Sequence, residues 1–481
     1  MHAAPVLKIL GLLLSILAVA MLIPMSFDLI SGNLDWNAFA AASLFTGFIG
    51  ICLWLANRKI NDNDLGLKEA FLLTNGAWAL IGLFGALPFY FSSLELSVVD
   101  SVFESTSGIT TTGSTILSDI EQASSGLLIW RALLQWLGGV GIIVMAIAVL
   151  PMLSVGGMQL FRTESFETAD KVIPRATQLA GGIFAVYTGL TILWTAMLAG
   201  AGMPSFDALA HAMTTLATGG YSTKTSSIGA FDSHLIELII IAGMIVGSLP
   251  FVHYLALARG GWKGLWNDPQ VKWFVVLMAA VITLITIDLN KDGHGWADAL
   301  RLSSFNSISV LTGTGYGTAD FALWGGASTT ILLICMFIGG CAGSTTCGIK
   351  MFRLQVLAAN IKVQLARLLR PHAVVIAYYN KRPVPEPVLD AVMGFFYLYI
   401  LCFVALTMIL GLFGLDFQTA LSGAATSISN VGPGLGDVIG PAGDFSDLPA
   451  GAKWAMCLGM LLGRLELFTV LVMLSPRFWG R

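Results

Sequence analysis

The stretch SVLTGTGYGTAD (residues 309–320) places glycines at 313, 315 and 317, directly after a short apolar run. Such a glycine-rich run can form a tight turn, hold a phosphate, or turn backbone carbonyl groups toward a metal ion. The dinucleotide-binding interpretation lacks a following βαβ unit and an acidic residue at the required distance. The choice among the remaining interpretations depends on the rest of the chain.

The composition is that of a membrane protein. Of the 481 residues, 56% are hydrophobic and only 11% are charged, against roughly a quarter charged in soluble domains. The net charge of −3 indicates nothing about partners, but the lack of a basic run argues against nucleic acid. Apolar segments long enough to span a bilayer predict about ten crossings by α-helices, near 7–30, 37–57, 69–92, 127–150, 179–201, 234–257, 271–289, 327–369, 388–413 and 452–475.

The N-terminus and the cysteines need separate comment. Ala18-Val19-Ala20 resembles a signal-peptidase site, but the apolar run continues far enough to span, so we expect a retained first helix. The cysteines form no CxxC pair and no zinc-like spacing with histidine. We expect them to be small buried residues, and they are Cys52, Cys335, Cys341, Cys347, Cys402 and Cys457.

The distribution of basic residues predicts the orientation. If the N-terminus is cytoplasmic, the opposite side carries few lysines and arginines, and both termini are cytoplasmic by the positive-inside rule. The basic residues on that outer side are Arg131, Lys224, Lys291, Arg301 and Lys453. The outer side also carries many acids, including Asp28 and Asp35. They are either solvated loop residues or groups that enrich cations near an entrance.

Four half-polar stretches recur between apolar segments on the outer side. They read VFESTSGITTTGST (102–115), ALAHAMTTLATGGYST (208–223), SFNSISVLTGTGYGTA (304–319) and LSGAATSISNVGPGLG (421–436). We align them on Gly113, Gly219, Gly315 and Gly432, which are preceded by Thr112, Thr218, Thr314 and Val431. A repeat of this spacing leaves room for a helix, a short re-entrant helix, a loop and a second helix in each unit.

Irregular backbone at membrane depth is tolerated only where it is buried or lines a cavity. Glycine permits the geometry that turns successive carbonyls the same way, and four carbonyls per layer can replace the hydration shell of a monovalent cation. This is the logic of the potassium-channel filter, Thr-Val-Gly-Tyr-Gly. The predicted filter residues are Thr111, Thr112, Gly113, Ala217, Thr218, Gly219, Gly220, Gly313, Thr314, Gly315, Tyr316, Asn430, Val431 and Gly432.

Segment 327–369 is too long for one crossing and is interrupted by FIGGCAGSTTCGIK (337–350). The P-loop pattern fails there because Ile349, not lysine, follows Gly348. Two interpretations remain, a kinked helix packed through its glycines and a loop that lies across the pore.

Single charged residues are further candidates. Arg464 stands inside the last apolar segment, so it is either paired with Glu466 of another segment, snorkelling to water, or a functional charge. Glu104 is either a hydrogen-bonded structural acid or an outer ion ligand. His211 and Asn306 are expected to pack and hydrogen-bond.

The chain resembles the potassium-uptake family of TrkH, TrkG and KtrB over nearly its whole length. The parts that carry the resemblance are the four loops, the stretch GGCAGSTTCGIK (339–350) and the stretch GRLELFTVL (463–471). The additional N-terminal helix pair (7–57) favours the TrkH/TrkG type. The resemblance implies that Arg464 is a barrier to cations under the filter. It also implies a loop that blocks the inner pore, formed by Gly339, Gly340, Cys341, Ala342, Gly343, Ser344, Thr345, Thr346, Cys347, Gly348 and Lys350.

One departure concerns Cys347, where family members usually carry glycine. The resemblance also implies a homodimer in the bacterial inner membrane, with one pore in each protomer. It further implies a TrkA-like cytosolic subunit that binds ATP/ADP or NAD(H), since this chain has no nucleotide site. No intrinsic cofactor is expected, and K⁺ is the ion held in the filter. The basic residues available to that subunit are Arg162, Lys171, Arg175, Arg353, Arg367, Arg370, Lys381 and Arg382.

The predicted fold is therefore all-α, with four helix–pore-loop–helix repeats around one pseudo-fourfold pore. Its parts are the N-terminal helix pair (1–66) and the repeats 67–176, 177–268, 269–385 and 386–481. The alternative is an ion-coupled secondary transporter of another cation or small solute, which predicts two inverted halves and a buried acid. A membrane enzyme would need clustered His, Asp or Cys at depth, and the six histidines are scattered, so we expect no enzyme.

Overall fold

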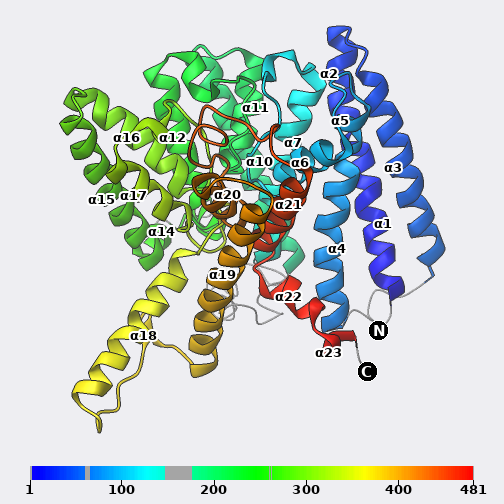
Figure 1. The fold of residues 1–481 in the computed structure, drawn as a ribbon. Helices are drawn as coiled ribbons and strands as arrows, with labels where there is room; N and C mark the ends of the chain where they lie inside the picture. Colours follow the sequence, from blue (N-terminus) through cyan, green and yellow to red (C-terminus); the bar gives the residue numbers. More distant parts are fainter. Residues whose placement is uncertain (1–2, 60–65, 147–175, 259, 262, 480–481) are drawn as a thin grey trace.

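The computed structural model describes residues 3–59, 66–146, 176–258, 260–261 and 263–479 (Figure 1). Within these residues, seven helical segments are long and apolar enough to cross a membrane, or up to nine if each of two bent helix pairs is one span. The protein is therefore a multi-pass membrane protein. The seven segments are Ala3–Ser31, Trp36–Asn57, Leu67–Phe91, Ser125–Val144, Gln178–Gly200, Pro269–Lys291 and Glu386–Leu412.

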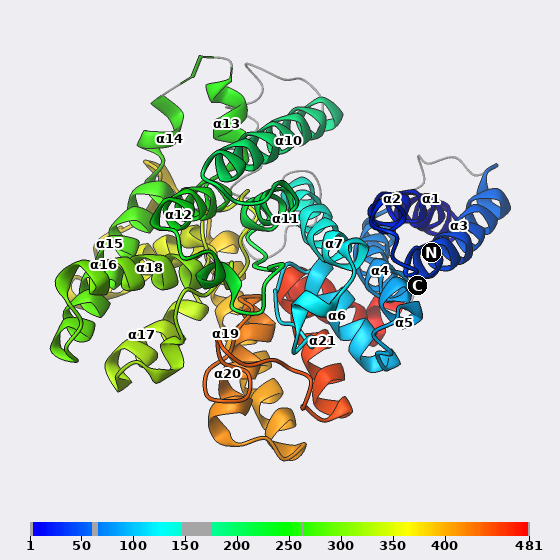
Figure 2. The ribbon, with the colours of Figure 1, turned by 90° about the horizontal axis from the view of Figure 1, so that it is seen from above.

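The N-terminal helices lie to one side of the other helices when the molecule is seen from above (Figure 2). They are α1 (Ala3–Ala20), α2 (Leu22–Ser31) and α3 (Trp36–Asn57). α1 and α3 approach closely because glycines face each other. A Cβ atom at Gly11 would lie 2.7 Å from the Gly50 carbonyl oxygen, so no larger residue fits this crossing.

Four short helices share one design. They are α6 (Val98–Ile109), α11 (Ser205–Leu216), α16 (Trp296–Leu311) and α20 (Phe417–Ser429). α6 begins where Ser97 accepts a hydrogen bond from the backbone N–H of Asp100, and α20 begins where Asp416 accepts one from Thr419. Hydrogen bonds from the side chain and backbone of Thr419 hold the pKa of the Asp416 carboxyl below its usual value. Each helix is too short to span and leads into an irregular loop.

The remaining helices surround these four. Seen from above, the chain runs around a central region, from cyan through green and yellow to orange (Figure 2). The flanking helices are α4 (Leu67–Gly85), α5 (Leu87–Phe91), α7 (Ser125–Val144), α10 (Ala176–Gly200), α12 (His234–Ser248), α13 (Phe251–Leu257), α14 (Lys263–Asn267), α15 (Pro269–Lys291), α17 (Gly326–Met336), α18 (Met351–Leu369), α19 (Glu386–Leu412), α21 (Ala450–Arg464), α22 (Phe468–Leu474) and α23 (Pro476–Trp479). Short 3₁₀ turns lie at Ile120–Gln122, Ser227–Phe231 and Phe321–Leu323.

Two apolar segments that we predicted as continuous crossings are bent instead. α12 and α13 meet at 99°, and α21 and α22 meet at 115°. Pro250 explains the first bend, because it has no N–H to continue the helix. At the second bend Glu466 and Leu467 have φ values of 63° and 46°, which no α-helix contains.

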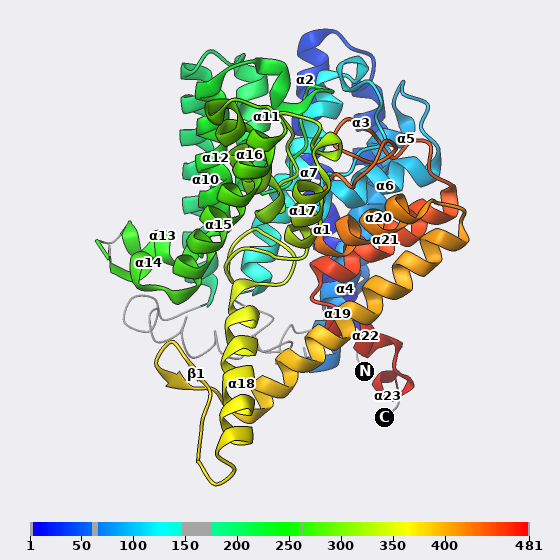
Figure 3. The same ribbon diagram turned by 60° about the vertical axis from the view of Figure 1, so that its left-hand side comes forward.

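α18 projects from the end of the molecule at which both termini lie (Figures 1 and 3). A two-residue hairpin of β1 (Tyr378–Tyr379) and β2 (Arg382–Pro383) follows it. Of the basic residues that we predicted for this face, Arg353 is instead fully buried, because it pairs with an acid described below. Arg162, Lys171 and Arg175 lie outside the described residues.

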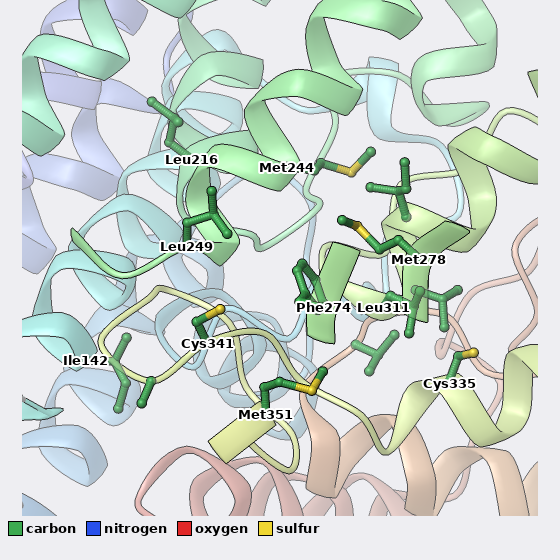
Figure 4. Packing of buried hydrophobic residues seen from close by; sticks show 14 of the residues in the cluster. Ile142, Leu216, Met244, Leu249, Phe274, Met278, Leu311, Cys335, Cys341 and Met351 are labelled. Atoms are coloured by element: carbon green, nitrogen blue, oxygen red, sulfur yellow. The ribbon is translucent and has the colours of Figure 1, made fainter. Parts of the chain in front are cut away.

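The largest apolar core joins α12, α15 and the segment between α17 and α18. Figure 4 shows Cys341 and Met351 beside Leu249 and Phe274. The interrupted segment is thus packed inside the molecule.

Candidate functional site

Each short helix is followed by a loop with the same backbone pattern. We name these loops 1 to 4 (residues 110–116, 217–223, 312–318 and 430–436). In each, two residues separated by one have positive φ. They are Thr111 and Gly113 (55° and 87°), Thr218 and Gly220 (49° and 80°), Gly313 and Gly315 (67° and 84°), and Asn430 and Gly432 (53° and 106°).

This pattern corrects our alignment of loop 2 by one residue. Gly220, not Gly219, matches Gly113, and Gly219 matches Thr112. The backbone hydrogen bonds agree, since Gly219 N–H donates to Thr214 O as Thr112 N–H donates to Ser107 O. Two adjacent glycines made the register ambiguous in the sequence.

The four loops meet in a ring. A Cβ atom at Gly113 would overlap the Gly219 oxygen, one at Gly220 the Thr314 oxygen, and one at Gly315 the Val431 oxygen. A Cβ at Gly432 would lie 3.0 Å from the Thr112 oxygen, which closes the ring. Each glycine therefore faces a carbonyl group of the next loop, at a distance that excludes any side chain.

Glycines from all four loops, Gly113, Gly220, Gly315 and Gly432, also line one cavity of about 70 Å³. Arg131 and Lys224 lie at its side. Every loop contributes at least two residues to its lining, as expected for loops that meet at a common axis.

Several carbonyl groups at the ring lack a donor. Among the described residues, the oxygens of Thr112, Thr314 and Val431 accept no hydrogen bond, and all three residues are buried. Buried carbonyls are almost always paired. A dehydrated monovalent cation can supply the missing interaction, because carbonyl oxygens replace its hydration shell.

Buried Ser and Thr hydroxyl groups support the loops through hydrogen bonds. Ser107 Oγ donates to Ser114 O at 2.6 Å, Ser309 Oγ to Tyr316 O at 2.7 Å, and Thr426 Oγ1 to Gly432 O at 2.7 Å. At the equivalent place in α11, the Thr214 hydroxyl bonds to the Tyr316 hydroxyl at 2.5 Å. Our sequence analysis missed these residues. Their signal is a Ser or Thr five residues before Thr112, Gly219, Thr314 and Val431.

The remaining predicted loop residues lie at the same ring. Ala217 directly follows the last residue of α11. Asn430 joins loops 4 and 1, since its Nδ2 donates to Thr112 Oγ1 at 2.8 Å and to Met460 O at 3.0 Å.

Behind loops 1 and 2 lies a buried ion pair. Arg131 Nε of α7 donates to Glu104 Oε1 at 2.7 Å, and its other nitrogens reach Thr115 Oγ1 and Ser222 O. Glu104 also accepts from the backbone N–H of Ile116 at 2.9 Å. Glu104 is therefore a hydrogen-bonded structural acid, as one of our two interpretations had it.

The polar residues in the corresponding places also make hydrogen bonds, as predicted. His211 Nε2 lies 2.9 Å from Ser222 Oγ, and Asn306 Nδ2 donates to Thr318 Oγ1 at 3.1 Å. Asp28 and Asp35, which we predicted to be either solvated outer loop residues or groups that enrich cations, are buried in the structure. Asp28 accepts hydrogen bonds from Ser124 and from Gly126 N–H, which join α2 to the start of α7.

The 337–350 segment is an irregular loop and not a kinked helix. Gly343 and Gly348 have φ values of 76° and 69°. The two ends of the loop, which we call its neck, are joined by a hydrogen bond that Gly339 N–H donates to Ile349 O at 3.0 Å. A Cβ at Gly339 would overlap the Cys347 oxygen, so the neck requires glycine.

This loop lies directly beside loops 1 and 2, on the side of α18. Thr345 Oγ1 donates to Leu216 O at 3.0 Å, and the Thr218 hydroxyl donates to Thr345 at 3.1 Å. Cys347 Sγ is 4.0 Å from Thr111 Oγ1. The other predicted loop residues, Gly340, Cys341, Ala342, Ser344, Thr346 and Lys350, belong to the same segment, which is buried at each of them.

Two neighbouring elements hold the loop in place. Gly343 O accepts from the Phe251 N–H of α13 at 3.0 Å, and Ala342 N–H donates to Gln270 Oε1 of α15 at 2.9 Å. The Lys350 ammonium bonds to Thr346 O within the loop.

Arg464 connects this loop to α7. Its Nη1 donates to Thr345 O at 3.1 Å, its Nη2 donates to Gly138 O at 2.8 Å, and it contacts Cys347 Sγ. It is buried and does not snorkel. Glu466 instead pairs with Arg353 of α18 at 2.5 Å. The interpretation in which Arg464 pairs with Glu466 was therefore wrong. Arg464 therefore lies under the ring as a charge held by carbonyl groups.

These features define the class of protein: a multi-pass α-helical membrane protein in which four short helices bring glycine loops to one ring. A family model, TrkH, described as "Cation transport protein", matches residues 36–290 and 294–481. The chain belongs to the TrkH cation transport protein family.

Individual relatives agree with this assignment. The chain is 42% identical over 480 residues to the Trk system potassium uptake protein TrkI of Halomonas elongata, covering 99% of this chain and 97% of that protein. It is 37% identical over 485 residues to the protein TrkH of Escherichia coli K12, covering 100% of both. The crystal structure of the potassium transporter TrkH from Vibrio parahaemolyticus matches with a TM-score of 0.92 and 35% identity, covering 100% of both chains. The boundaries of the four repeats stay a prediction.

Proposed function

We propose that this protein takes up K⁺ across a bacterial inner membrane, through a channel-like pore whose selectivity filter is formed by loops 1 to 4. The observation that carries the proposal is the ring of buried carbonyls at Thr112, Thr314 and Val431, which accept no hydrogen bond from any described residue. K⁺ is the cargo, and backbone oxygens bind it in place of water. The relatives are named as potassium uptake proteins, which supports K⁺ over another cation.

The 337–350 loop is the proposed gate and Arg464 the proposed pore barrier. The loop contacts residues at the inner side of loops 1 and 2, where it obstructs the path below the ring. A buried positive charge raises the energy of a cation in the same low-dielectric space. Opening then requires the loop to leave its hydrogen bonds to Gln270, Phe251 and Arg464.

We further propose a homodimer with one pore in each protomer, both termini in the cytoplasm, and a TrkA-like cytosolic subunit that binds ATP/ADP or NAD(H). The relatives' names refer to a Trk system, which is consistent with a second component. α18 and the hairpin offer it a projecting surface (Figure 3), with exposed Lys362, Arg367, Arg370 and Lys381.

The test is growth and Rb⁺ uptake in cells without their own potassium systems. The wild type should restore growth at low K⁺. Gly315→Ser should abolish uptake or admit Na⁺, because its Cβ overlaps the Val431 oxygen. Gly317→Ser is the matched control in the same loop, since the atom nearest to its Cβ lies at 3.9 Å, and it should behave as the wild type.

Two results would contradict the proposal. If Gly315→Ser and Gly317→Ser have the same effect, the ring is not the filter. If the wild type moves an organic solute or another cation but no K⁺, the ion-coupled secondary transporter is the better interpretation.

A further inference from the structure

Loop 2 differs from its neighbours in chemistry but not in backbone shape. In loops 1 and 3, a threonine at the ring bonds to the threonine two residues earlier. Thr112 Oγ1 lies 2.8 Å from Thr110 Oγ1, and Thr314 Oγ1 lies 2.7 Å from Thr312 Oγ1. The equivalent residues in loop 2 are Ala217 and Gly219. This loop therefore lacks both hydroxyl groups.

The side chain of Gln135 occupies the space that a residue at 219 would need. The three atoms nearest to a Cβ built on Gly219 all belong to the Gln135 amide, and the Cβ would overlap them. The φ of Gly219 is not positive, so its backbone accepts an L-residue. Gln135, and not backbone conformation, is what excludes a threonine here.

Gln135 also supplies hydrogen bonds. Its Nε2 donates to Gly219 O at 2.7 Å, and its Oε1 accepts from Tyr221 N–H at 3.1 Å. The two bonds hold the residues on either side of Gly220, which is the glycine of loop 2 that faces Thr314 O. Gln135 is fully buried and lies one helical turn from Arg131 on α7, so a rigid helix supports it.

We propose that Gln135 is a positioning and specificity-determining residue for ion selection. From its place on α7, it takes over the supporting role of the threonine side chain that loop 2 lacks. A carbonyl oxygen has two lone pairs, so Gly219 O can accept from Gln135 and still face a cation. The amide fixes the direction of this one carbonyl. The inference rests on the proposed function, because it assigns a role in ion selection to the same ring.

The first experiment compares Gln135→Met with the wild type. Methionine has a similar volume but makes neither hydrogen bond. Rb⁺ uptake should persist. Inhibition of that uptake by Na⁺ should strengthen by about fivefold, the effect of losing the one hydrogen bond to Gly219 O. Thr191→Val is the matched control. It removes a bond of 3.0 Å to Trp136, the next residue of α7, without touching a loop, and it should leave ion selection unchanged.

The second experiment replaces the support that Gln135 gives to loop 2 by the threonine found in loops 1 and 3. Gly219→Thr alone should lose uptake, because the new side chain overlaps Gln135. Adding Gln135→Ala removes the obstacle and gives loop 2 the threonine of loops 1 and 3. The double variant should recover at least about half of wild-type Rb⁺ uptake, since the overlap is then relieved. The amount of each variant in the membrane is measured in parallel.

The inference is overturned if Gln135→Met discriminates K⁺ from Na⁺ as well as the wild type does. It is also overturned if the double variant is no better than Gly219→Thr in membrane abundance or uptake. Neither result would affect the proposed function, which fails only if the wild type does not take up K⁺.

Discussion

At the scale of single residues, buried polar groups carry the argument. The guanidinium of Arg464 bonds to two backbone carbonyls, Thr345 O of the 337–350 loop and Gly138 O of α7. It therefore places a positive charge beside this loop and ties the loop to α7. In the function that we propose, both effects oppose the passage of a cation.

Arg464→Ala should pass K⁺ faster and with more leak. Removing one buried charge and two hydrogen bonds lowers the barrier, and on the order of tenfold faster Rb⁺ influx corresponds to about 1.4 kcal/mol. Arg464→Lys keeps the charge and is the control, with influx closer to that of the wild type. Unchanged influx kinetics in the alanine variant would refute the barrier.

The pair of Glu104 and Arg131 should matter for stability. Both side chains are essentially buried, so Arg131→Met leaves a buried carboxylate unpaired, which costs about 3–5 kcal/mol. Thermal unfolding of the purified protein in detergent measures the loss. Arg301→Met is the comparison, because Arg301 is 34% exposed although its partner Glu237 is only 7% exposed, so water reaches the arginine and the loss should be smaller. Equal losses in the two variants would contradict the argument.

At the scale of elements, the breaks in the helices position the site. The four short helices end where their loops turn, and α17 and α18 are separated by the 337–350 loop. The bend between α21 and α22 turns Glu466 toward Arg353 on the first turn of α18. This ion pair connects the first turn of α18 to the bend between α21 and α22.

Gly339→Ala should open the neck of the loop, because its Cβ overlaps the Cys347 oxygen. Cys347 is buried in the closed loop, at 8% exposure. With the other five cysteines replaced, a thiol reagent should label Cys347 several times faster in Gly339→Ala than in its parent, as local opening becomes more frequent. Gly326→Ala, where a Cβ has open space, is the control. Equal labelling rates in all three would reject a glycine-dependent neck.

At the scale of the whole molecule, the arrangement of the ends agrees with the orientation that we propose. Both termini and the projecting α18 lie at one end of the molecule (Figure 1), and the ring of loops lies away from that end. The exposed basic residues of α18 also belong to this end, as the positive-inside rule requires of a cytoplasmic face.

A reporter that fluoresces only in the cytoplasm should therefore fluoresce when it is fused after Arg481. A periplasmic phosphatase fused at the same place should be inactive. A phosphatase inserted near Asp292, in the turn after α15, should be active, because this turn lies on the outer side. The reverse pattern of activities would invert the proposed orientation.

Much of this protein was predictable because its signals are local. Hydropathy indicated the membrane class, the glycine runs indicated four loops, and Gly339 to Gly348 indicated an interruption, since each depends on neighbouring residues alone. The register of loop 2 was not predictable, because both Gly219 and Gly220 fit the pattern and only the backbone distinguishes them.

The sequence by itself determined that the chain crosses a membrane many times and carries four equivalent loops, because apolar length and glycine spacing constrain the backbone wherever the chain folds. Only the tertiary structure decided which residues support those loops. Gln135 meets Gly219, Arg464 meets Thr345, and Arg353 meets Glu466. These pairs are far apart in the chain, and the packing of helices, not any local pattern, brings them within hydrogen-bond distance.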